Sequence, residues 1–158
     1  MEEKSGHRRS VVIAMDSSAS AEKAFKWYVE NLRRPEDNVV MVTVVHVMDV
    51  FTPAQWRELM SSSDLDVSSF NVEKQRQTLE QNLEDLRVMM KEAKVDGTVQ
   101  CIQAASASKG ILAVAENCGA DCIISGSRGA RIFQVGVLGS TTEDLLHNSN
   151  VTLVVCPD

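Results

Sequence analysis

Three glycines in the last third of the chain have a spacing that could form a phosphate-binding loop. Gly126-Ser-Arg-Gly129 follows a short apolar segment, and Gly139 comes after nine intervening residues. Glycine lets backbone N–H groups approach an anion closely, and a helix that begins after Gly139 would direct further N–H groups at it. Arg128 and Arg131 add positive charge beside the glycines. The alternative is that these glycines only make turns. Their combination after a buried strand favours phosphate binding.

The residues after Gly139 predict a helix N-terminus with a capping box. Ser140-Thr-Thr-Glu143 has the S/T-x-x-E pattern, in which the serine hydroxyl and the glutamate carboxylate bond otherwise unpaired N–H groups. The hydroxyls of Ser140 and Thr141 could also bond a phosphate oxygen. Capping and phosphate binding are compatible roles for these hydroxyls.

Two residues at the ends of earlier apolar segments are candidates for the other half of a nucleotide site. Asp16 follows Val11–Met15 and precedes a helical pattern, so it could be an N-cap or an Asx turn. Its carboxylate could equally accept hydrogen bonds from a ribose or a base amino group. Val47 ends the second apolar segment and could line an adenine pocket, although most strand valines belong to the core.

The sequence offers little support for catalysis. His7, His46 and His147 lack a carboxylate and a nucleophile at motif spacing, and they form no HxxxH or His/Cys cluster. A Walker GxxxxGK[ST] motif is absent, and no lysine follows the glycines to reach a transferring phosphate. We therefore assign no catalytic and no metal-ligating residue, and we expect a protein that holds a nucleotide more than it cleaves one.

Length and composition favour one compact domain over the 158 residues. The apolar content of 44% can form a core, whereas an aromatic content of 4% and a net charge of -6 argue against nucleic-acid binding. The polar N-terminal segment has no apolar signal region, and no segment has the length of a membrane span, so we expect a cytoplasmic protein without membrane contact. The four cysteines lack CxxC spacing and are expected to be reduced, mostly buried thiols: Cys101, Cys118, Cys122 and Cys156.

The apolar segments alternate between strand and helix patterns. This alternation predicts right-handed crossovers and a parallel, doubly wound α/β sheet, whose ligand lies beyond the carboxyl ends of the strands where the strand order reverses. Strands are expected at 11–15, 39–47, 99–102, 122–125 and 151–156, and helices at 21–32, 70–94, 111–115 and 142–147. Gly97 is expected to stop the longest helix, residues 1–9 to form a flexible tail, and 48–69 to be a long connection.

With these residues in view, the chain resembles the universal stress protein family from Val11 to Pro157. The ATP-binding members carry G-x2-G-x9-G-(S/T), which matches Gly126, Gly129, Gly139 and Ser140 without a spacing error. The resemblance implies a five-stranded sheet in the order 3-2-1-4-5, with ATP or AMP between the first and fourth strands and Mg²⁺ possible through the phosphates. It also implies a homodimer paired through Val151–Val155, and an exposed apolar edge strand needs such a cover.

The resemblance assigns the cofactor-binding residues in two groups. Asp16 and Val47 would contact adenosine, and the residues of the glycine motif would hold the phosphates. The full candidate set is Ala14, Met15, Asp16, Val47, Ser125, Gly126, Arg128, Gly129, Gly139, Ser140 and Thr141.

Three features of the sequence depart from the family pattern and concern details of the pocket. Ser17 stands where the family often has glycine, and Thr141 where it has an apolar residue. The 48–69 connection carries Phe51 and Trp56 and could be a lid over the nucleotide or a surface cluster.

The leading hypothesis is a nucleotide-binding regulatory protein of the stress-response type. The alternatives are a slow Mg²⁺-dependent ATPase or phosphotransferase, and a nucleotide-free dimerisation module.

Overall fold

The computed structural model contains a five-stranded parallel sheet and describes residues 6–45, 66–128 and 138–157. The strands are β1 (Ser10–Ala14), β2 (Asn38–Val45), β3 (Gly97–Gln103), β4 (Cys122–Gly126) and β5 (Thr152–Cys156). Their order is β3-β2-β1-β4-β5, with every neighbouring pair parallel. The predicted fold class and strand order are therefore confirmed.

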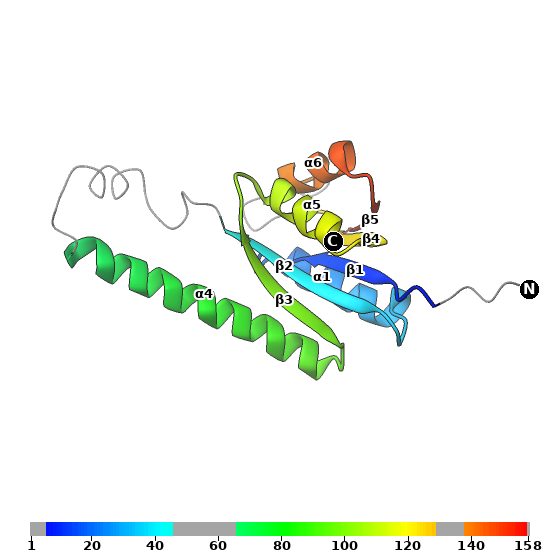
Figure 1. Cartoon of the computed structure of the whole chain (residues 1–158), viewed down its shortest axis with the longest axis horizontal. Coiled ribbons are helices and arrows are strands. Elements are labelled where there is room, and N and C mark those ends of the chain that lie inside the picture. Colours follow the sequence, from blue (N-terminus) through cyan, green and yellow to red (C-terminus); the bar gives the residue numbers. More distant parts are fainter. Residues whose placement is uncertain (1–5, 46–65, 129–137, 158) are drawn as a thin grey trace, which may run out of the picture.

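Helices cover both faces of the sheet. They are α1 (Ala19–Trp27), which continues as a π-helical turn η1 (Tyr28–Leu32), then α4 (Asp66–Glu92), α5 (Ala107–Asn117) and α6 (Ser140–Asn148). Figure 1 shows α5 and α6 on one face, α1 and α4 on the other, and the N-terminal part of α4 extending past the sheet. This doubly covered arrangement explains the continuous apolar runs of the central strands.

The two central strands, β1 and β4, carry the most deeply buried side chains. Val11, Ile13 and Ile124 pack toward α1 and α4, whereas Val12 and Ile123 pack toward α5 and α6, and all five side chains are fully buried. Each such side chain contributes about 1.5–3 kcal/mol by leaving water. The carboxyl ends of β1 and β4 are thereby held in fixed positions.

The long helix α4 differs from the expectation at both ends. It begins at Asp66, so the last four residues of the expected 48–69 connection are helical, while residues 46–65 with Phe51 and Trp56 lie outside the described part. At its other end the chain turns at Lys94, which has a φ of 54°. Gly97 is therefore not the helix stop.

Gly97 is the first residue of β3, and its lack of a side chain lets β3 approach β2. A Cβ at Gly97 would overlap the Val39 carbonyl oxygen and lie 2.8 Å from the Met90 methyl group. Close approach of the backbones, rather than helix termination, explains glycine at this position.

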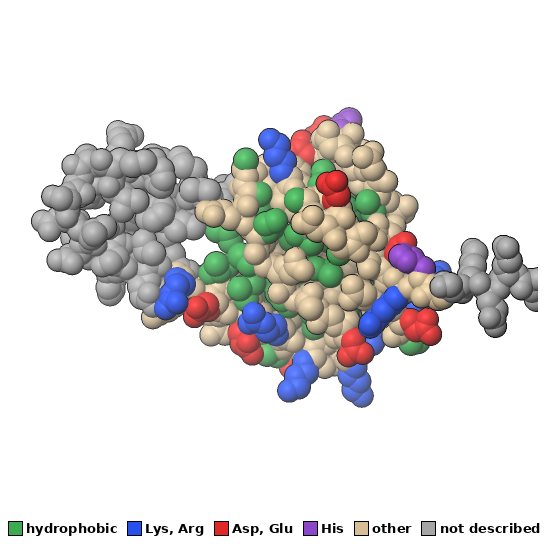
Figure 2. Space-filling model, in the orientation of Figure 1, with side chains coloured by type: hydrophobic (Ala, Val, Ile, Leu, Met, Phe, Trp, Pro, Cys, Tyr) green, Lys and Arg blue, Asp and Glu red, His purple; other side chains and the backbone are tan. Residues whose placement is uncertain are grey.

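The surface around α4 mixes both signs of charge. Figure 2 shows basic and acidic side chains interspersed along this helix, and Arg87 and Arg76 pair with Glu84 and Glu80 at 3.3 and 3.6 Å. None of the helices in the described ranges is long and apolar enough to cross a membrane.

The cysteines lie in different environments. Cys122 and Cys156 are buried as expected, and burial raises the pKa of both thiols. Cys118 is half-buried and Cys101 is exposed, so the expectation of burial is wrong for Cys101. The reason is that β3 is an edge strand, which leaves much of its surface open to solvent.

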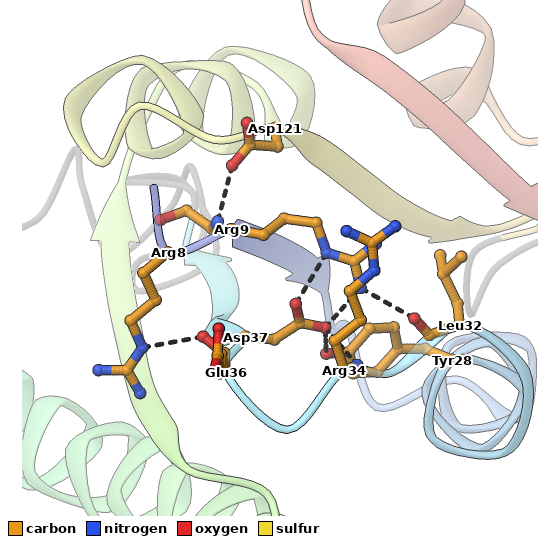
Figure 3. A network of polar contacts seen from close by, with 9 residues as sticks. Arg8, Arg9, Tyr28, Leu32, Arg34, Glu36, Asp37 and Asp121 are labelled. Atoms are coloured by element: carbon orange, nitrogen blue, oxygen red, sulfur yellow. Dashed lines mark hydrogen bonds and ion pairs between the residues drawn. The ribbon is translucent and has the colours of Figure 1, made fainter. Parts of the chain in front are cut away.

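An ion pair between the partly buried Arg9 and the buried Asp37 joins the amino ends of β1 and β2, as Figure 3 shows. The Arg9 guanidinium donates to both carboxylate oxygens of Asp37 at 2.8 and 2.6 Å, and the Tyr28 hydroxyl donates to the same carboxylate at 2.6 Å. Burial raises the pKa of Asp37, but the hydrogen bonds from Arg9, Tyr28 and a backbone N–H outweigh burial and hold that pKa below its ordinary value. Arg9 belongs to the segment expected as a tail, of which residues 1–5 lie outside the described part.

Candidate functional site

A pocket opens at the carboxyl ends of β1, β2 and β4, where a doubly wound sheet is expected to hold its ligand. The space between its walls is about 470 Å³, part of it open to solvent. Its walls come from the sheet and from the N-terminal parts of α1, α5 and α6. The lining residues are Ala14, Met15, Asp16, Ala21, Val42, Val44, Ala107, Ile111, Ser125, Gly126, Arg128, Thr141 and Thr142.

Most of the predicted site residues lie together in this pocket. Seven of them line it: Ala14, Met15, Asp16, Ser125, Gly126, Arg128 and Thr141. Gly139 and Ser140 lie beside it at the start of α6, where Gly139 is buried and Ser140 is exposed. Val47, Gly129 and Arg131 lie outside the described residues, so their predicted roles stay predictions.

Asp16 sits in a tight turn between β1 and α1. Its Oδ1 accepts a hydrogen bond from the Ser18 N–H at 3.0 Å, which makes an Asx turn, and Ser18 is the N-cap of α1. Ser17 between them has a φ of 64°, a left-handed conformation that favours glycine. The turn therefore keeps the conformation that glycine would take, and the Asp16 side chain combines a structural role with a place in the pocket wall.

The apolar end of the pocket involves residues that the sequence analysis missed. Val42 and Val44 are two positions apart on β2, so their side chains point to the same face of the sheet. Ala107 and Ile111 are one turn apart on α5. A Cβ at Gly110 would lie 2.7 Å from a Val44 methyl group, so glycine lets α5 pack closely against β2. The available signal was this glycine inside a helical pattern, which indicates close packing.

Three helices begin around the pocket, and their N-termini differ. Ser18 caps α1 by accepting from the Ala21 N–H at 3.1 Å, and Ser106 caps α5 by accepting from the Lys109 N–H at 3.2 Å. The N-cap of α6 is Gly139, and no side-chain hydrogen bond caps this end within the part of the chain that the structure describes. The first N–H groups of α6 lack intrahelical partners, as at every helix start.

The expected capping box at Ser140 is therefore wrong. The Gly139 N–H donates to the Ser127 carbonyl at 2.8 Å, and the Gly139 carbonyl accepts the first helical bond from the Glu143 N–H at 3.0 Å. These bonds make Gly139 the cap and Ser140 the first helical residue, one position too late for its hydroxyl to cap. Among the residues that the structure describes, no side chain caps the backbone N–H groups at the start of α6, and such groups favour an anion.

Packing against α1 explains why position 126 requires glycine. A Cβ at Gly126 would lie 2.9 Å from the backbone carbon and oxygen of Ser20, so no side chain fits there. The Ser20 hydroxyl also accepts from the Arg128 N–H at 3.4 Å. Glycine at position 126 was expected because it lets an anion approach the backbone closely. The contact with Ser20 is a second, architectural reason for glycine there.

Comparison with known proteins agrees with this geometry. The sequence model of the Universal stress protein family matches residues 7–157, and the chain belongs to this family. A search of curated proteins gave no match.

Solved structures share the fold at low sequence identity. Hypothetical protein MJ0577 is 23% identical with a TM-score of 0.72, and the match covers 96% of each chain. A universal stress protein solved in complex with cAMP is 15% identical with a TM-score of 0.63, covering 94% of this chain and 96% of the other. An Arabidopsis thaliana family protein solved with AMP bound is 15% identical with a TM-score of 0.59, covering 94% and 90%. At these identities the likeness shows the fold.

Proposed function

We propose that this protein binds an adenine nucleotide, ATP or AMP, in the pocket at the carboxyl ends of β1 and β4. The observation that carries the proposal is the pairing of an apolar pocket end with a helix start that no described side chain caps. The family structures solved with AMP and with cAMP support it, because they show that this fold accommodates adenine nucleotides.

The pocket divides into regions that suit the parts of a nucleotide. The apolar side chains from β2 and α5 suit an adenine ring, and the Asp16 carboxylate suits ribose hydroxyls. Phosphates would lie near Arg128 and the N–H groups of Ser140 and Thr141, where charge and helix dipole favour an anion. Val47 and Gly129 extend this assignment as predictions, and Mg²⁺ would be held through the phosphates.

We infer a regulatory role for nucleotide binding, in which the bound nucleotide changes the surface offered to partners. No catalytic residue is assigned. The proposal places the protein in the cytoplasm as a homodimer, with no nucleic-acid or membrane partner.

The direct test of binding is a calorimetric titration of the purified protein with ATP and AMP. We expect saturable binding, weakened about tenfold or more in Arg128→Gln, since a charge-assisted hydrogen bond contributes roughly 1.5–3 kcal/mol. Arg87→Gln on α4 is the matched control because it removes the same charge far from the pocket wall, and it should bind as the native chain does. Absence of saturable binding by the native chain would contradict the proposal.

A further inference from the structure

One carbonyl group beside the pocket receives two hydroxyl hydrogen bonds. The Thr142 hydroxyl donates to the Gly126 carbonyl oxygen at 2.8 Å, and the Ser125 hydroxyl donates to the same oxygen at 3.0 Å. Both side chains are buried, with exposed fractions of 3% and 5%. The two bonds thus lie in a protected environment where hydrogen bonds hold atoms firmly.

The two hydrogen bonds have different structural consequences. Ser125 precedes Gly126 in β4, so its bond to the Gly126 carbonyl is local, and its hydroxyl also lies 3.4 Å from the Thr142 hydroxyl. Thr142 lies in the first turn of α6, sixteen positions away, so its bond ties this helix directly to the end of β4. The threonine bond is thus a side-chain tie between the helix start and the strand end, beside the backbone bond from the Gly139 N–H to the Ser127 carbonyl.

The bond from Thr142 also sets the direction of the Gly126 carbonyl. A carbonyl oxygen turned into the pocket would repel phosphate, whereas this oxygen is bonded by a side chain of α6. The next residue is held as well, because the Ser127 N–H donates to the Cys156 carbonyl at 3.0 Å and the Ser127 carbonyl accepts from the Gly139 N–H. The strand end and the helix start therefore form one hydrogen-bonded unit beside the pocket.

We propose that Thr142 is a positioning residue for the phosphate half of the site: its hydroxyl tethers α6 to β4 and so aims the N–H groups of the helix start at the nucleotide's phosphates. The inference rests on the proposed nucleotide binding and deepens it. Thr142 acts through the backbone it holds, because its hydroxyl is already bonded to Gly126. The tether predicts that affinity for phosphates depends on Thr142 while affinity for the nucleoside does not.

The substitution Thr142→Val separates this role from simple stability. Valine keeps the size of the side chain and removes the hydroxyl, and the Gly126 carbonyl keeps its bond from Ser125, so no buried polar group is left unsatisfied. Thr142→Ser restores the hydroxyl. Leu145→Val is the matched control, because Leu145 is a fully buried residue of the same helix and its truncation loosens α6 without touching the tether.

The experiment compares ATP with adenosine by calorimetric titration of the native chain and the three variants. We expect Thr142→Val to weaken ATP binding about tenfold and to leave adenosine binding unchanged, whereas Thr142→Ser and Leu145→Val keep the native ratio of the two affinities. Hydrogen exchange of the nucleotide-free proteins should show faster exchange at the start of α6 in Thr142→Val than in Leu145→Val.

The outcomes separate this inference from the proposal on which it rests. If the native chain binds ATP and Thr142→Val keeps the native ratio of ATP to adenosine affinity, the positioning role is overturned while nucleotide binding stands. An equal loss of affinity for ATP and for adenosine in Thr142→Val would likewise overturn the positioning role, since general destabilisation would then explain the weaker binding. If the native chain binds neither ligand, both the proposed function and this inference fail.

Discussion

At the scale of single residues, the Arg9–Asp37 pair should contribute to stability in a pH-dependent way. Asp37 has a side chain that is 2% exposed, and it accepts bonds from Arg9, Tyr28 and the Arg34 N–H. Removing one partner of a buried pair leaves the other charge uncompensated, which costs about 3–5 kcal/mol. This network lies at the amino ends of the strands, so its loss should leave the pocket geometry intact in the folded protein.

The predicted change is that Asp37→Asn lowers the free energy of unfolding by about 3 kcal/mol at neutral pH. Because the folded pKa of Asp37 is depressed, its stabilisation is present above the ordinary carboxyl pKa and is lost as the pH falls through the folded value. The difference between native chain and variant should therefore shrink in acid. Urea unfolding at a series of pH values measures the difference in free energy of unfolding between the native chain and Asp37→Asn. A difference that stays constant down to strongly acidic pH would contradict the stabilising role of the Asp37 carboxylate.

Single residues of the pocket could be predicted where a charged residue or a glycine lies at the end of an apolar strand. Asp16 and Gly126 were found this way, and both line the pocket. Val44 and Ile111 were missed because nothing in their type distinguishes a pocket valine or isoleucine from a core one. Ser17, a departure from the family pattern, has a left-handed φ of 64°, a conformation that glycine adopts more readily than serine.

At the scale of elements, the glycine cap of α6 sets this helix apart from α1 and α5. A capping side chain would stabilise the helix and occupy the N–H groups proposed for phosphate. Gly139 has a φ of -66°, which any residue can adopt. A charged side chain at this position should therefore weaken nucleotide binding.

We expect Gly139→Asp to weaken ATP binding about tenfold or more, since the carboxylate repels phosphate at the helix start. Gly139→Asn is the control that adds a side chain of similar size without charge, and its loss of affinity should be smaller. Calorimetric titration gives the affinities, and circular dichroism checks that both variants fold. Unchanged or tighter ATP binding in the aspartate variant would show that phosphates do not approach this helix start.

Strands were more predictable than helix ends. Continuous apolar runs predicted β1, β2 and β4, because both faces of the sheet are covered there. The shorter apolar segments at 99–102 and 151–156 predicted the two edge strands β3 and β5. The start of α4 was placed too late, since serines at 68 and 69 are typical of loops. The capping box at Ser140 failed because the backbone bond from Gly139 to Ser127, a contact between distant residues, decides where α6 begins.

At the scale of the whole molecule, the two edges of the sheet differ in character. β3 exposes polar residues such as Thr98 and Gln100, whereas β5 carries the half-buried apolar residues Leu153, Val154 and Val155. Leu146 on the neighbouring α6 is 52% exposed. An exposed apolar edge strand favours pairing with another chain, which supports the proposed homodimer through β5.

The homodimer proposal predicts that Val154→Lys converts a dimer into a folded monomer, because a charged residue on an edge strand opposes pairing. Gln100→Lys places the same charge on the β3 edge and should leave the dimer intact. Sedimentation equilibrium measures the masses, and circular dichroism checks the fold. A native chain that sediments as a monomer would contradict pairing through β5, as would a Val154→Lys variant that remains dimeric.

The central claim is that an adenine nucleotide binds between the carboxyl ends of β1 and β4, and the backbone amide NMR spectrum recorded during titration with ATP tests it most directly. Binding at this site should give saturable shifts concentrated at Asp16, Gly126 and the Ser140–Thr142 turn of α6, with little change around Asp37 at the opposite end of the sheet. An absence of saturable shifts would contradict the claim, and so would shifts centred on another surface.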